Sequence, residues 1–215
     1  MPAFFVPLFT ALLASSAHAD EATISETRAV PTGQSDAATQ RLALHLYVFR
    51  GSRWETDTVA AIVPAAGAVL AQCGIGIERA QLHIVDAPAH FRSYSTPVSR
   101  QLMRAMAVTK PAVFFVDETL NRPAYDAEAI GLANSRTRPE LAHTIWVAYG
   151  TRDLPVALAH ELVHILSNSG AHSDEPGNLM REETSWQNTK LAPDQCEQAR
   201  ERGNAQGLLT SRRRQ

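Results

Sequence analysis

The chain has 215 residues, 45% of them hydrophobic, which is enough to bury one substantial core or at most two small ones. Its 20 basic and 22 acidic side chains leave a formal net charge of −2, a balance that indicates neither a nucleic-acid partner nor a membrane-surface partner. The arginine run at 212–214 is therefore interpreted as part of a solvated basic tail, 211–215, and not as a binding patch.

Residues 1–19 are typical of a secretory signal peptide. They contain no Asp, Glu, Lys or Arg, carry an apolar run from Phe4 to Leu13, and finish with the A-x-A pattern Ala17-His18-Ala19. An n-region without Lys or Arg is the atypical feature. We expect cleavage near Ala19 and export to the periplasm or the exterior. Because the apolar run is shorter than the roughly 20 residues that cross a bilayer, we expect no membrane span in the mature chain.

The mature chain is predicted to begin with a flexible leader, residues 20–40, which shows no apolar period. One domain is expected to follow over residues 41–210. It contains both cysteines of the chain, Cys73 and Cys196. An even count permits one disulfide in an exported protein, and two separately buried thiols fit the sequence as well.

Extended and helical patterns alternate along this domain. Strand patterns lie at 42–49, 82–85, 112–116, 129–134 and 144–149, helical periodicity lies at 54–73, 98–108 and 154–166, and a last helix runs from near Pro193 to about Arg202. This order predicts an α/β fold with a mixed, mostly parallel sheet of five strands. The short stretch Ala129–Asn134 is joined to its neighbours by loops, so it is the expected antiparallel edge strand.

The helix predicted at 154–166 carries the pattern HELVH at 160–164. Asp153 is its expected N-cap, and Pro155 lies in the first turn, where a missing N–H costs nothing. Positions i and i+4 share one helix face, so His160 and His164 can bind one metal ion. Glu161 is turned by about 100° around the axis, close enough to hold a water on the metal. Such polar groups are expensive to bury in an apolar helix without a partner, so the pattern predicts a zinc hydrolase site.

His172 is the predicted third ligand. Turn-forming residues at 167–170 should end the helix and lead the chain back, and His172 is the one histidine downstream of the helix. Carboxylates also bind zinc, which leaves four alternatives open: Asp174, Glu175, Glu182 and Glu183.

Together with Asn178-Leu179-Met180, this arrangement resembles the active site of the metzincin clan of zinc peptidases. In that clan two helical histidines and a third beyond a glycine turn bind zinc, and a methionine-containing 1,4-turn runs beneath the metal. The resemblance covers roughly residues 42–203, including the edge strand and a short C-terminal part with one closing helix. One spacing departs from the clan. Its third histidine stands six residues after the second, where this chain has Gly170, and Ser167 replaces the usual glycine.

The resemblance implies a zinc-dependent metallopeptidase. Three protein ligands would leave one position on zinc for water, Glu161 would be the general base, and Met180 would shape the floor beneath the metal. A peptide or protein substrate would lie along the edge strand. Two other functions stay open: a gluzincin-type peptidase with Glu182 or Glu183 on zinc, and a metal-binding or interaction protein without catalysis. The sequence predicts no oligomeric state.

Overall fold

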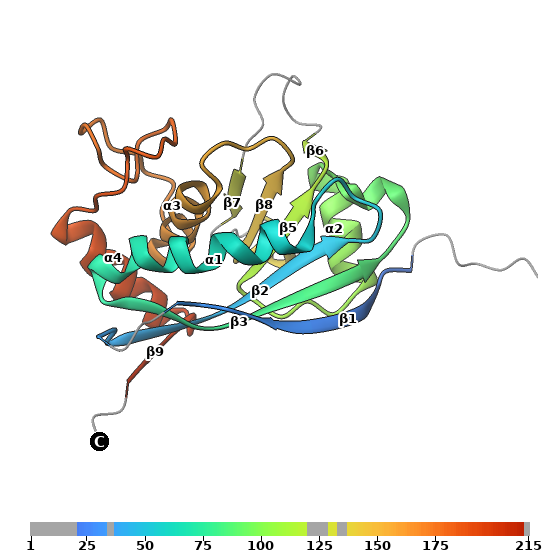
Figure 1. Ribbon diagram of the computed structural model, residues 1–215, viewed down its shortest axis with the longest axis horizontal. Coiled ribbons are helices and arrows are strands. Elements are labelled where there is room, and N and C mark those ends of the chain that lie inside the picture. The colour runs from blue at the N-terminus through green and yellow to red at the C-terminus, as the bar shows by residue number, and fades with distance from the viewer. Residues whose placement is uncertain (1–20, 34–36, 120–128, 133–136, 213–215) are drawn as a thin grey trace, which may run out of the picture.

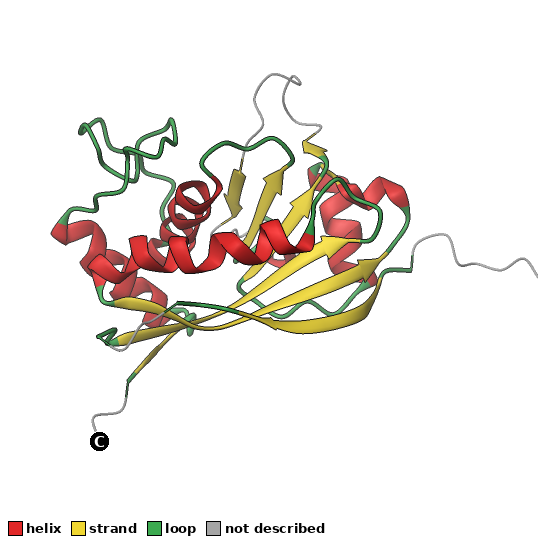
Figure 2. Cartoon of the chain, viewed as in Figure 1, coloured by secondary structure: helices red, strands yellow, loops and turns green. Residues whose placement is uncertain are grey.

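The computed structural model describes residues 21–33, 37–119, 129–132 and 137–212. The predicted signal peptide and residues 213–215 of the predicted tail lie outside these ranges. The strands are β1 (Thr23–Val30), β2 (Gln40–Phe49), β3 (Ile75–Asp86), β4 (Ser93–Tyr94), β5 (Ala112–Val116), β6 (Glu118–Thr119), β7 (Ala129–Leu132), β8 (Thr144–Ala148) and β9 (Leu209–Ser211). The helices are α1 (Thr56–Leu70), α2 (Thr96–Ala105), α3 (Leu154–Ser167) and α4 (Pro193–Ala205), with 3-10 turns η1 (Ala71–Cys73), η2 (Ala89–Arg92) and η3 (Pro139–Leu141) (Figure 2).

The main sheet has the order β1-β3-β2-β5-β8-β7, with β9 paired to β2. Its central strands β3, β2, β5 and β8 run parallel, and β7 pairs antiparallel with β8 at one end of the sheet. The predicted α/β fold, its mostly parallel sheet and its antiparallel edge strand are therefore confirmed. The sheet has seven strands and not five, because β1 and β9 add to those predicted. Ala133 and Asn134 of the predicted edge strand lie outside the described residues.

The prediction of a flexible leader is wrong for Thr23–Val30. This segment is β1, which pairs antiparallel with β3 from Thr23 opposite Asp86 to Val30 opposite Ala80. Most of its side chains are exposed, so backbone hydrogen bonds and not an apolar face place it in the sheet. A strand held in this way shows no hydrophobic period in its sequence. Likewise Ser211, expected in the tail, belongs to β9.

Helices cover both faces of the sheet (Figure 1). Helices α1, α3 and α4 pack on the face that carries the even-numbered residues of β2 from Leu42 to Val48. Helix α2 packs on the opposite face, which carries Tyr47 and Phe49. Successive side chains of a strand point to opposite faces, so one apolar strand supplies both layers of the core. The mainly apolar run from Leu42 to Phe49, interrupted by His45, follows from this position in the middle of the sheet.

Helix α1 is followed by η1 and then by Gly74, which takes the left-handed conformation with φ of 67°. Thr56–Cys73 has the length and mean hydropathy of a membrane-spanning helix. However, Val63, Ala66 and Leu70 of this helix are buried in the core. An apolar face packed on a sheet is what a core helix requires.

Cys73 and Cys196 form a disulfide, which settles the choice between a disulfide and two separate thiols. The bond joins η1 to α4 across 123 residues of sequence, with the Cα atoms 4.9 Å apart. Arg200 of α4 adds a hydrogen bond from Nη1 to the carbonyl of Cys73 at 3.0 Å. The closing helix is thereby fixed to the N-terminal half of the chain.

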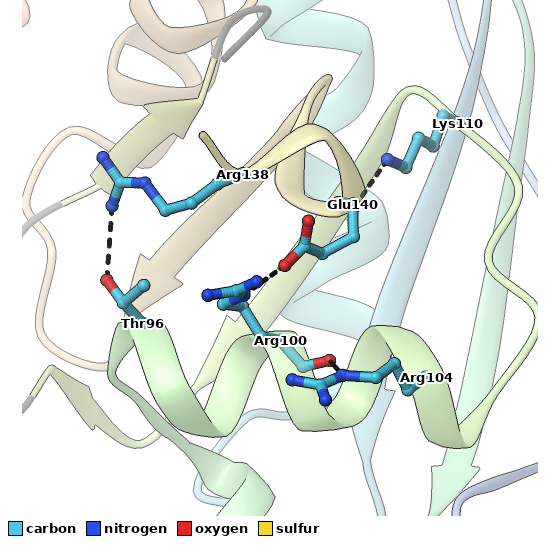
Figure 3. A network of polar contacts seen from close by, with 6 residues as sticks. All are labelled: Thr96, Arg100, Arg104, Lys110, Arg138 and Glu140. Carbon is cyan, nitrogen blue, oxygen red and sulfur yellow. Dashed lines mark hydrogen bonds and ion pairs between the residues drawn. The ribbon is translucent and has the colours of Figure 1, made fainter. Parts of the chain in front are cut away.

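On the α2 side of the sheet, a polar network joins α2 to η3 (Figure 3). Glu140 of η3 forms an ion pair with Arg100 of α2, and the carbonyl of Glu140 accepts a hydrogen bond from Nζ of Lys110 at 2.7 Å. Arg138 reaches Oγ1 of Thr96 at 3.4 Å. Because η3 leads directly into β8, these contacts fix the start of the strand that precedes α3.

Candidate metal centre

Helix α3 carries the HExxH pattern and is buried along almost its whole length. It contacts α1, α4, β7 and β8. Asp153 occupies the N-cap position, but the expected side-chain cap is absent: the residue is left-handed, with φ of 48°. Its Oδ2 accepts the backbone N–H of Trp186 at 3.0 Å instead. The start of the helix is thereby connected to the loop that follows it.

Backbone carbonyls hold the two helical histidines. Nδ1 of His160 lies 2.7 Å from the carbonyl oxygen of Leu179, and Nδ1 of His164 lies 2.8 Å from that of Ser169. A carbonyl oxygen can only accept, so each Nδ1 carries the proton and donates. The neutral rings therefore present an unprotonated Nε2 on the side away from the carbonyl.

His172 returns to the helical pair after a turn at the end of α3. The helix continues through Ser167, and Asn168 takes the left-handed conformation with φ of 51°, which Asn tolerates better than most residues. The turn falls one residue later than the position of the metzincin glycine, and a longer loop brings His172 back. Nε2 of His172 lies 3.2 Å from Nε2 of His164, which itself lies 2.9 Å from Nε2 of His160.

The imidazoles of His160, His164 and His172 converge as metal ligands do, with their ligand atoms all within 4.8 Å of one another. The Nε2 atoms of His160 and His164 are both unprotonated and lie 2.9 Å apart. Their lone pairs therefore repel each other. A cation bound by both nitrogens would remove this repulsion. Zn–N bonds of about 2.0–2.1 Å in a tetrahedral site put two nitrogens about 3.3 Å apart, close to the observed separations. The donor set therefore fits zinc or another transition metal that prefers imidazole.

The helical histidines are in the protonation state that a metal needs. Burial lowers the pKa of His160 below its usual 6.5, with the Leu179 carbonyl opposing the shift and His172 adding to it. Burial also lowers the pKa of His164 to about 4, and His160 adds to the shift. Both rings are neutral at pH 7, and the neutral ring is the form that binds metal.

The carboxylates weighed as alternative ligands do not join this cluster. Among the residues that the structure describes, the three histidines are the one group of three or more His, Cys, Asp or Glu side chains close enough to share an ion. The alternatives are exposed in the loop between α3 and α4: Asp174, Glu175, Glu182 and Glu183. Glu161 is buried beside His160 on α3, with 7% of its surface exposed. The structure thus brings together all three predicted histidines and separates them from the rival carboxylates.

A tight turn at 178–181 lies against His160. The N–H of Arg181 donates to the carbonyl of Asn178 at 3.3 Å, an i to i+3 bond that defines a 1,4-turn. Oδ1 of Asn178 accepts the N–H of Met180 at 2.8 Å. Met180 is buried in the core that also contains α3. The methionine therefore lies in a 1,4-turn whose Leu179 carbonyl supports the first helical histidine.

Sequence patterns predict the three histidines as candidate ligands but do not predict the groups that orient their rings. The acceptors for the two helical rings are main-chain carbonyls of Leu179 and Ser169. Every residue type carries such a carbonyl, so no residue pattern encodes the contact. Turn-forming residues after the helix indicate a reversal of the chain without indicating which carbonyl will face a ring.

A scan against protein-family models and a search of curated proteins find no match. Among solved structures, the chain is similar to metalloproteinase-II from Bacteroides fragilis, with a TM-score of 0.53 and 20% sequence identity. The similarity covers 82% of this chain and 57% of that one, so this chain spans a little over half the length of that structure. The likeness shows a shared fold, a mixed α/β structure with a mostly parallel sheet.

Proposed function

We propose that the protein is a zinc-dependent, metzincin-like metallopeptidase that hydrolyses peptide bonds. One observation carries the proposal: the ligand atoms of His160, His164 and His172 converge within 4.8 Å of one another, while carbonyls fix the two helical rings in the metal-binding tautomer. The fold shared with a metalloproteinase supports the same conclusion.

In this proposal the three histidines bind the metal and Glu161 transfers protons. Bound zinc supplies a Lewis acid that polarises the scissile carbonyl and lowers the pKa of a water molecule towards 7. His160, His164 and His172 would hold this ion through their ring nitrogens. Glu161, beside His160 on α3, takes a proton from the attacking water and later delivers it to the leaving amine. Glu161 is itself buried, with 7% of its surface exposed.

The proposed substrate is an extended peptide or protein segment. Strand β7 is the last strand of the sheet on the side next to α3, and within the described residues no strand pairs with its outer edge. An extended peptide can bind such an edge through backbone hydrogen bonds. This placement would bring its scissile bond alongside the helix that carries Glu161.

We also propose that the protein acts after export. Two features support this location: the cleavage pattern at Ala17-His18-Ala19 in the sequence and the Cys73–Cys196 disulfide, since disulfides persist mainly in oxidising compartments.

Zinc content and peptide hydrolysis of purified variants test the proposed function. The wild type should hold about one zinc per chain, His172→Ala should lose most of it, and Glu161→Gln should keep it. Hydrolysis of a mixed peptide library should fall by about 10²–10⁴-fold in Glu161→Gln. Glu182→Gln serves as the matched carboxylate control and should retain both properties. Zinc loss in Glu182→Gln with retention in His172→Ala would establish a gluzincin-type site. Stoichiometric zinc with no hydrolysis in the wild type would leave a metal-binding protein.

A further inference from the structure

Residues 189–191 form a short extended segment behind the turn that supports His160. On one side of it, the N–H of Lys190 donates to the carbonyl of Gly177 at 3.0 Å, and the carbonyl of Lys190 accepts the N–H of Leu179 at 2.6 Å. In an extended chain the backbone groups of neighbouring residues point to opposite sides. The N–H of Leu191 and the carbonyl of Thr189 therefore point away from the turn.

The side chain of Gln72 forms hydrogen bonds with these two outward-pointing backbone groups. Its Oε1 accepts the N–H of Leu191 at 2.8 Å, and its Nε2 donates to the carbonyl of Thr189 at 2.8 Å. The side-chain amide thus accepts one backbone hydrogen bond from the segment and donates another to it, as the peptide groups of a neighbouring strand would. A further bond from Nε2 to the carbonyl of Val69, at 2.7 Å, holds the amide on the end of α1. The next residue, Cys73, is joined covalently to Cys196 of α4. This bond restrains the backbone from which the Gln72 side chain extends.

We propose that Gln72 is a positioning residue for the metal centre. The backbone of Leu179 connects the extended segment to the histidine. Its N–H donates a hydrogen bond to the carbonyl of Lys190, and its carbonyl accepts one from Nδ1 of His160. Holding residues 189–191 in place therefore holds the Leu179 carbonyl in place and, through it, the orientation of the His160 ring. Partners that orient a metal ligand in this way contribute to metal affinity although they never touch the ion. The inference rests on the metal binding in the proposed function and not on peptide hydrolysis.

Three variants separate positioning from general stability. Gln72→Ala removes the contacts to Thr189 and Leu191, and the exposed position of Gln72 favours an intact fold. Gln72→Glu keeps an acceptor for Leu191 and should recover part of the effect. Arg200→Ala is the matched control, because the hydrogen bond that it removes goes to the same 3-10 turn, at the carbonyl of Cys73, and not to residues 189–191.

Two readouts are measured on the full mature chain. Competition with a chromophoric chelator gives the dissociation constant for zinc, and NMR gives the solvent-exchange rate of the His160 Nδ1 proton in the metal-free protein. In Gln72→Ala we expect the dissociation constant to rise about tenfold, at the lower end of the range for partners outside the ligand shell, and the proton to exchange several-fold faster. Arg200→Ala should change neither.

The inference is overturned if Gln72→Ala leaves both readouts at their wild-type values, or changes them no more than Arg200→Ala does. If the wild type binds no zinc, the proposed function fails, but the exchange rate in the metal-free chain still decides whether Gln72 orients His160.

Discussion

The carbonyl oxygen of Leu179 lies 2.7 Å from Nδ1 of His160, so a turn 19 residues further along the chain orients the first histidine of the helix. The ring cannot rotate away without giving up this hydrogen bond while buried. Residues that shape the turn should therefore affect metal binding without being ligands.

Asn178→Ala tests this dependence. Oδ1 of Asn178 accepts the buried N–H of Met180 at 2.8 Å, and losing a partner for a buried donor costs about 1–3 kcal/mol of unfolding free energy. We expect that loss in urea denaturation, together with a roughly tenfold weaker zinc affinity. Asn178→Asp keeps the acceptor and should retain most of the affinity. Equal zinc affinities in Asn178→Ala and the wild type would show that the turn does not control the ring.

Removal of the metal should lower stability. A ligand that binds only the folded state stabilises it by about 2.7 kcal/mol when present at 100 times its dissociation constant. We expect the thermal midpoint to fall when EDTA replaces zinc in the wild type and to stay nearly constant in His172→Ala. A midpoint that does not respond to zinc in the wild type would contradict binding at the cluster.

Elements whose side chains form the core could be predicted, and elements held by backbone contacts could not. Strand β2 and helix α3 bury mainly apolar side chains, and this apolar patterning predicts both elements. Strand β1 exposes most of its side chains and is held by main-chain pairing with β3, so its sequence is typical of a leader. The same limit applies to Gln72, whose partners are the backbone groups of Thr189 and Leu191.

The candidate site also has a part that could be predicted from the sequence and a part that could not. The spacing of His160 and His164 follows from helix geometry and could be read directly. Whether His172 or a carboxylate such as Glu182 lies next to the helical pair depends on the path of the loop, which begins with the left-handed turn at Asn168. Several residue types can occupy such a turn, so the sequence alone could not predict that the rings of all three histidines converge.

Met180 should matter through packing and not through the metal. It is buried, with 3% of its surface exposed, so Met180→Ala is expected to cost about 2–5 kcal/mol in unfolding free energy. Met180→Leu conserves volume and should cost less than about 1.5 kcal/mol. Calorimetry measures both, and zinc content should stay near the wild-type value in Met180→Leu. Loss of zinc in the folded Met180→Leu variant would assign the sulfur a direct role.

The Cys73–Cys196 disulfide should account for a large part of the stability. It closes a loop across 123 residues, and cross-links of this length stabilise by about 3–5 kcal/mol, chiefly by restricting the unfolded chain. The Cys73→Ser and Cys196→Ser double variant should lose this amount in guanidinium denaturation. Adding a reductant should lower the midpoint of the wild type and leave that of the double variant unchanged. A wild-type midpoint insensitive to complete reduction would contradict this role.

A second pair of histidines, outside the metal centre, provides a pH dependence of stability. Nε2 of His83 lies 3.0 Å from Nδ1 of His45, and Nδ1 of His83 lies 2.8 Å from Oγ1 of Thr27. Burial lowers the pKa of both rings below 6.5, with Arg79 adding to the shift for His45 and His45 adding to that for His83. The pair is therefore held neutral in the folded chain.

Lowering the pH should destabilise the fold through this pair. Well above pH 6.5 both states are essentially unprotonated at these rings, whereas near and below pH 6.5 the unfolded state binds more protons than the folded state. The unfolding free energy should therefore fall as the pH drops from 7 to 5, by less than about 1.4 kcal/mol per pH unit for each ring. In metal-free protein, His45→Gln should reduce this slope, because it removes one titrating ring and its effect on His83. His90→Gln changes an exposed histidine and serves as the control. Equal slopes in His45→Gln and the wild type would show that the pair does not contribute.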